Sequence, residues 1–184
     1  MWKLVEFLRA FAGDARAQLS VAVSYMAASP DKRHDSKVLY WARRAGRGGD
    51  TRGYILAAGI IARNGPTAAG WKQVFEAYWA AAHAGDPDGQ QGLAWCYEEG
   101  VGVFMNLERG WYWLNVAAAN GSEAAQLALS RRFELGDGVD RDEGRARVYL
   151  ELAQQHQKMK KRHVGIPVPL PRGGVPDEQA EACK

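Results

Sequence analysis

The fold is decided by residues 85–120, which read GDPDGQQGLAWCYEEGVGVFMNLERGWYWLNVAAAN. The Gly-Asp pair that opens this stretch recurs every 36 residues, as Gly13-Asp14, Gly49-Asp50 and, with serine in place of aspartate, Gly121-Ser122. The four copies align without a gap. A constant period of this length is typical of proteins built from stacked structural repeats.

Individual side chains follow the same period. With the first glycine of each copy counted as offset zero, offset five holds Gln18, Tyr54, Gln90 and Gln126, and offset twelve holds Tyr25, Ile61, Tyr97 and Phe133. Offset thirty-two holds Ala45, Ala81, Ala117 and Ala153. Large groups recur at some positions and small groups at others, which is what helices packed at fixed distances require.

Each copy is predicted to form two helices, which in the third copy cover residues 87–99 and 106–118. Between them lies Gly100-Val101-Gly102-Val103. A glycine that follows a helix end can adopt the left-handed conformation that satisfies the last helical carbonyls. Asn106 stands where the side chain can cap the start of the second helix. The sequence therefore predicts an all-α chain of helix pairs.

These motifs resemble the Sel1-like repeat, a relative of the tetratricopeptide repeat. The third copy carries the resemblance most fully, in Ala94, Tyr97, Gly100-x-Gly102-Val103, Trp111-Tyr112-Trp113 and Ala117-Ala118. The resemblance covers about residues 13–156, as four repeats at 13–48, 49–84, 85–120 and 121–156. It implies a right-handed α-solenoid that binds proteins or peptides and catalyses no reaction. In bacteria, such proteins serve as adaptors and scaffolds or as immunity proteins that neutralise toxins.

Residues 1–12 are expected to form a helix that caps the first repeat. Leu4, Val5, Leu8 and Phe11 share one face of that helix, which is therefore expected to be amphipathic. Glu6 and Arg9 interrupt the apolar run that a secretory leader would need, so a cytoplasmic protein is expected.

Residues 157–184 are expected to extend the last helix and then to form a flexible proline-rich tail. Pro167, Pro169 and Pro171 alternate with apolar residues, a pattern that blocks a helix. Ligands of SH3 domains need prolines three residues apart, whereas these are two apart. A loose tail is therefore favoured over a proline-recognition motif.

No residues have the spacing of a catalytic or metal centre. The four histidines are scattered without a partner at metal-ligand spacing, so neither a metal nor another cofactor is expected. The alternative to a binding protein is a hydrolase of the β-lactamase-like kind reported for cysteine-rich relatives. Those relatives carry paired cysteines in each repeat, whereas this chain has only Cys96 and Cys183. We therefore expect that this protein is not an enzyme.

The charge is unevenly distributed along the repeats. Residues 13–48 carry seven basic and three acidic residues, a net charge of +4, whereas residues 85–120 carry one basic and five acidic residues, a net charge of −4. One interpretation is a partner of complementary charge. The other is a solvated surface without such a role. The basic end lacks an aromatic platform for stacking bases, so no nucleic-acid partner is expected. The sequence contains no run of 18 apolar residues, so no membrane partner is expected either.

The partner is expected to bind in a groove lined by the first helix of each copy. Offsets three, ten and fourteen lie on that helix and do not repeat their chemistry between copies, so no common packing role explains them. The candidate groove residues at these offsets are Arg52, Arg63, Asp88, Trp95, Glu99 and Arg131. Trp95 is the strongest candidate because tryptophan and arginine often dominate binding energy. The alternative is that Trp95 packs between the two helices of its own copy.

Deleting residues 165–184 is expected to leave the helix content and the melting temperature nearly unchanged. Alternating prolines and a glycine pair cannot join a helical stack. Circular dichroism of the truncated chain measures both quantities. Aggregation or loss of helix would show instead that the tail is docked on the solenoid.

Overall fold

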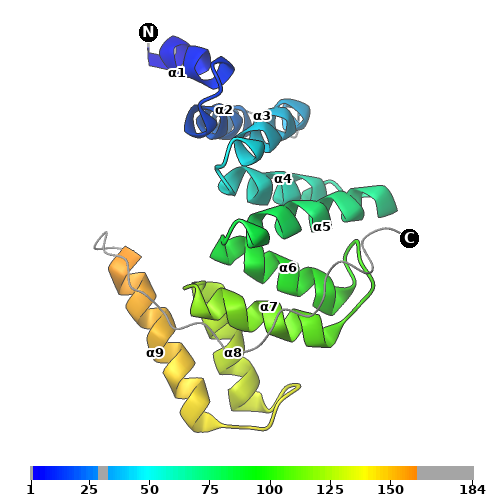
Figure 1. The fold of residues 1–184 in the computed structure, drawn as a ribbon, viewed down its shortest axis with the longest axis vertical. Helices are drawn as coiled ribbons and strands as arrows, with labels where there is room; N and C mark the ends of the chain where they lie inside the picture. Colours follow the sequence, from blue (N-terminus) through cyan, green and yellow to red (C-terminus); the bar gives the residue numbers. More distant parts are fainter. Residues whose placement is uncertain (1, 29–32, 161–184) are drawn as a thin grey trace.

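The computed structural model describes residues 2–28 and 33–160, with the side chains of residues 2, 3 and 160 left out. This part of the chain contains nine helices and no strand. The helices are α1 Trp2–Phe11, α2 Ala15–Ala28, α3 Asp35–Arg47, α4 Arg52–Arg63, α5 Ala68–His83, α6 Pro87–Glu99, α7 Leu107–Ala119, α8 Glu123–Leu135 and α9 Glu143–Lys160. Each helix packs on the next in chain order, from α1 at one end of the array to α9 at the other (Figure 1). The expected α-solenoid is confirmed. The proline-rich tail lies outside the described residues.

The glycines spaced by 36 residues lie at the bends between helix pairs. Gly13, Gly49, Gly85 and Gly121 all have positive φ angles, between 83° and 102°. This region of backbone conformation is costly for a residue with a Cβ atom, so glycine is needed at each bend. At three bends the following side chain accepts hydrogen bonds from backbone N–H groups of the next helix; these residues are Asp14, Asp86 and Ser122. One short motif therefore ends one pair and starts the next.

The core repeats with the period of the sequence. Tyr97 and Phe133 are 3% and 5% exposed, which confirms that they are buried at equivalent positions. The alanines at offset thirty-two are all buried. Small residues also let the helices approach closely, since a Cβ atom on Gly53 would lie 2.3 Å from the Ala42 carbonyl oxygen. Helices packed this closely leave no room for a larger side chain at Gly53 or at offset thirty-two.

A buried glutamine links each helix pair to the one before it at three of the four bends. The side-chain Nε2 of this residue donates to a backbone carbonyl eight residues earlier: Gln18 to Ala10 at 2.9 Å, Gln90 to Ala82 at 3.4 Å and Gln126 to Ala118 at 2.8 Å. We call this contact the glutamine latch. All three glutamines are buried. Each latch adds a second hydrogen bond to a carbonyl near the end of the preceding helix, which also accepts from the backbone N–H of the bend glycine at 3.0–3.3 Å.

The residue at offset thirty-five completes two of the three latches. Asn120 donates to Oε1 of Gln90 at 2.8 Å, and Nδ1 of His156 lies 3.0 Å from Nε2 of Gln126. In the first copy this offset is Gly48, and Oε1 of Gln18 is buried without a partner among the described residues. The second copy has Tyr54 instead of glutamine, so the latch is missing at that bend.

Helix α1 packs on the stack with residues outside its most apolar face. Leu4, Val5, Leu8 and Phe11, which form that face, are all more than half exposed. Ala10 is buried instead, and the Phe7 ring packs against Trp41 of α3. Phe11 keeps an edge-to-face contact with Trp41.

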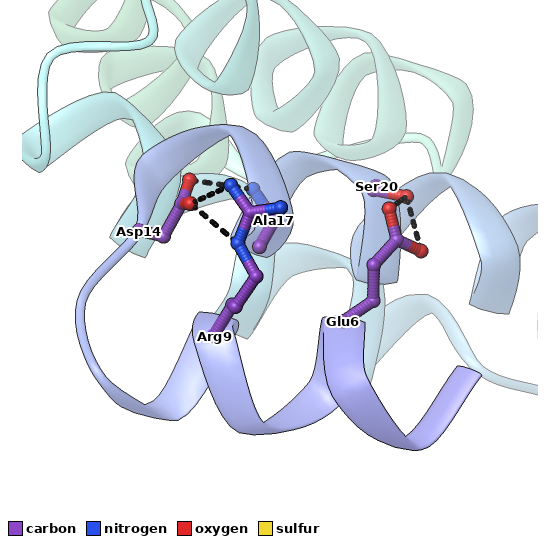
Figure 2. Close-up of polar contacts among 5 residues, drawn as sticks. All are labelled: Glu6, Arg9, Asp14, Ala17 and Ser20. Carbon is purple, nitrogen blue, oxygen red and sulfur yellow. Dashed lines mark hydrogen bonds and ion pairs between the residues drawn. The ribbon is translucent and has the colours of Figure 1, made fainter. Parts of the chain in front are cut away.

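Polar contacts explain this orientation of α1. Arg9 donates to Asp14 at 2.5 and 3.0 Å, and Ser20 donates to Glu6 at 3.0 Å; Figure 2 shows both contacts. Asp14 also accepts from the backbone N–H of Ala17; this bond and the Arg9 side chain hold the pKa of Asp14 below its ordinary value. Together with the Gln18 latch to Ala10, these contacts fix the rotation of α1 about its axis.

Among the described residues, no helix combines the length and apolar character needed to cross a membrane.

Replacing Tyr97 or Phe133 with alanine is expected to lower the free energy of unfolding by about 3–5 kcal/mol, as for other large aromatic side chains in cores. The cavity would lie between two packed helix pairs, so the array should melt at a lower temperature as a whole. Thermal unfolding followed by circular dichroism measures the effect. A melting temperature within a degree of the wild type would contradict this role.

Replacing Gln126 with alanine is expected to lower the free energy of unfolding by about 1 kcal/mol, because the buried hydrogen bond to the Ala118 carbonyl is lost, although that carbonyl still accepts from the backbone N–H of Gly121. Gln155 is exposed on α9, so its replacement with alanine is the matched control. Chemical denaturation of both variants measures the difference. Equal midpoints would show that the latch does not stabilise the stack.

Candidate functional site

The first helix of every pair presents an exposed face formed by offsets three, ten and fourteen. These offsets are separated by seven and four residues, so they lie on the same side of a helix. All twelve residues are exposed: Arg16, Val23, Ala27, Arg52, Gly59, Arg63, Asp88, Trp95, Glu99, Ala124, Arg131 and Leu135. We call this surface the first-helix face. It contains all six residues that the sequence analysis proposed for partner binding.

Two of the six candidate residues form ion pairs with aspartates. Arg52 donates to Asp50 at 2.7 and 2.8 Å, and this bond holds the pKa of Asp50 below its ordinary value. Arg63 donates to the buried Asp35 at 2.6 Å and thereby ties the end of α4 to the start of α3. Arg63 therefore has a structural role that its exposure alone does not suggest.

The Trp95 side chain packs against two aromatic rings and remains partly exposed to solvent. Its indole makes edge-to-face contacts with Trp71 and Tyr78 of α5, with ring centroids 6.5 and 6.4 Å apart. Its side chain is nevertheless 36% exposed. Trp95 thus packs on the second helix of the preceding pair, which the sequence analysis did not anticipate. A large ring that is preoriented and open to solvent loses little conformational entropy when it binds a partner.

The first helices of successive pairs lie close together. The backbone of α6 comes close to those of both α4 and α8, whereas successive second helices meet through side chains, such as Arg43 of α3 with Gln73 of α5 and His83 of α5 with Trp113 of α7. Arg132 on α8 donates two hydrogen bonds of 2.8 Å to Glu98 on α6. Both side chains are largely buried. This pair was not predicted from the sequence, although the two residues lie 34 positions apart, close to one period.

A groove of about 370 Å³ opens between α3 and α5, where these second helices are not packed together. Its lining residues are Arg43, Arg47, Tyr54, Ala57, Ile61, Gln73, Glu76 and Ala77. We call it the α3–α5 groove. The sequence analysis did not identify it. The signal was present at offset twenty-eight, which holds Trp41, Trp113 and Tyr149 in the other copies and Ala77 here.

The described residues show little of the chemistry that catalysis needs. They contain no group of three or more histidine, cysteine, aspartate or glutamate side chains able to hold a metal ion. Cys96 is fully buried, and burial raises the pKa of its thiol to about 12. The thiol is therefore protonated at neutral pH and is a poor nucleophile.

Comparisons with known proteins agree with the helical repeat. The model of the Sel1 repeat matches residues 87–122 and 123–153. A Sel1 repeat protein from Oxalobacter formigenes superposes with a TM-score of 0.69 and 27% sequence identity over 78% of this chain. The protein c5321, described as a protective antigen of uropathogenic Escherichia coli with an SLR fold, gives a TM-score of 0.68 and 27% identity over 89% of this chain. The present chain spans 58% and 37% of those two structures. Comparison with curated protein sequences finds no match.

Proposed function

We propose that this Sel1-repeat solenoid is a non-catalytic module that binds a partner protein or peptide on its first-helix face. Sel1 repeats generally mediate protein–protein interaction. The proposed contacts are Arg52, Arg63, Asp88, Trp95, Glu99 and Arg131.

The observation that carries the proposal is the exposure of offsets three, ten and fourteen in all four copies. Core offsets keep their chemistry in most copies, with the second copy as the exception, because each serves the same packing contact. The first-helix face varies instead, for example from Gly59 through Trp95 to Arg131 at offset ten. A solvent-exposed surface with aromatic and charged residues at its centre has the composition of binding hot spots.

The close approach of the first helices supports this choice of surface. The inner curve of a stack has the shorter path, so the helices that lie close together line it. Such curvature produces the extended concave surfaces on which repeat proteins bind their partners.

Charge along the first-helix face would orient the partner. Arg52 lies on α4, whereas Asp88 and Glu99 lie on α6. Opposite charges at successive positions favour one direction of binding over its reverse. Arg52 and Arg63 already face aspartates, so Trp95 and Arg131 are expected to contribute most of the affinity.

We further propose that the protein is a bacterial adaptor or scaffold, or an immunity protein that neutralises a toxin, and that it acts in the cytoplasm. The resemblance to bacterial Sel1 repeat proteins supports the bacterial assignment. The cellular role depends on the partner's identity.

Replacing Trp95 or Arg131 with alanine is expected to weaken binding by about 2 kcal/mol each and to leave the helix content unchanged. The partner is first isolated by affinity capture on the wild-type chain, and the purified pair is then titrated by calorimetry. Arg147→Ala, which removes an exposed arginine from α9, is the matched control and should bind like the wild type. Unchanged affinity in both test variants would remove the first-helix face as the binding surface.

A further inference from the structure

The α3–α5 groove lies on a different surface from the first-helix face. Its deepest residues are Ala57 and Ile61 of α4, which are 1% and 8% exposed. The arginines of α3 and Glu76 of α5 line its more exposed parts. The groove therefore combines an apolar floor with charged walls, the combination that favours a side chain inserted from a partner.

Comparison with the next junction shows what this groove lacks. Between α5 and α7, the His83 ring stacks on Trp79 with centroids 3.9 Å apart and lies 5.3 Å from Trp113. Trp113 is almost fully buried there. The residues equivalent to Trp79, His83 and Trp113, one period earlier, are Arg43, Arg47 and Ala77.

The groove thus lies where the other copies place an aromatic ring. At offset twenty-eight, Ala77 replaces a residue that is aromatic in the other three copies. At offset eight, Ala57 stands where the later copies have Leu93 and Leu129. The missing latch adds to this difference, since Tyr54 replaces glutamine and its side chain lines the groove.

The charged residues around the groove favour an anionic ligand. Arg43 spans the groove by donating to Gln73 at 2.7 Å. Arg47 is exposed beside it, and Glu76 is the one acidic residue among those that line the groove. Guanidinium groups bind carboxylates through paired hydrogen bonds and also stack on aromatic rings.

We propose that the α3–α5 groove binds an acidic segment of a partner protein that inserts an aromatic side chain beside Ala77. The ring occupies the position that an aromatic residue fills in the other copies, and flanking carboxylates pair with Arg43 and Arg47. This inference rests on the proposed function and adds a second contact surface to it, with a stated partner chemistry.

A labelled peptide tests the inference with the full chain. The probe is fluorescein-labelled Glu-Asp-Phe-Glu-Asp, and its binding is followed by fluorescence anisotropy. Two matched peptides replace the phenylalanine with alanine or the acidic residues with their amides. The acidic peptide with phenylalanine is expected to bind most tightly, and added salt should weaken it.

Two variants locate the site. Arg47→Gln is expected to weaken the peptide about tenfold through the lost charge pair. Ala77→Trp is expected to abolish saturable binding by filling the groove, with a melting temperature equal to or above that of the wild type. Arg147→Gln removes the same charge from α9 and should bind the peptide like the wild type.

Four results would overturn the inference. Loss of peptide binding in Trp95→Ala, with normal binding in Arg47→Gln and Ala77→Trp, would assign the peptide to the first-helix face and leave the proposed function standing. Equal binding of all three peptides, or binding of none, would remove the assigned partner chemistry. Binding that appears only after residues 164–184 are deleted would identify this chain's own tail as the occupant.

Discussion

Three of the four bends in the stack are held by a buried hydrogen bond between a glutamine side chain and a backbone carbonyl of the preceding helix. Nε2 of Gln18, Gln90 and Gln126 reaches a carbonyl eight residues earlier, across the glycine bend that separates the pairs. The carbonyl lies near a helix end and also accepts from the backbone N–H of the bend glycine, so the latch adds a second, buried hydrogen bond between the preceding helix and the next pair. Because the bond has a fixed length and direction, it restricts the angle at which successive pairs meet. Small residues at offset thirty-two then allow the close contact that this angle requires.

The second copy departs from this arrangement, and its surroundings change with it. Tyr54 stands at the latch position, and its ring packs over Gly46, where a Cβ atom would lie 2.8 Å from the ring carbons. At the same junction, Ala77 replaces the aromatic residue of offset twenty-eight. The stack still closes, because α4 contacts both α3 and α5, but the space between the two second helices is not filled. A repeat protein can thus obtain a local groove by shortening one or two side chains without altering its backbone period.

The ends of a solenoid follow different rules from its interior. Within the described residues, helix α1 packs on one neighbouring pair, and the apolar residues of its outer face are exposed. The ion pair of Arg9 with Asp14 and the bond between Glu6 and Ser20 act together with the Gln18 latch to hold α1 by its polar side. Apolar periodicity identified this segment as a helix, but it could not identify the face that packs. That choice is made by contacts with residues that belong to the next helices.

The sequence by itself determined the period, the glycine bends, the two helices of each copy and the residues that repeat in the core. It also identified the exposed offsets, because a position that changes from glycine to tryptophan to arginine cannot serve one repeated packing contact. These features are local or periodic, so comparison of four copies within one chain reveals them. Only the tertiary structure decided that Arg63 is paired with Asp35, that Trp95 rests on Trp71 and Tyr78, and that a groove opens beside Ala77. Each of these depends on side chains from different helices meeting in space, and the distance between helices is set by the packing of the whole stack.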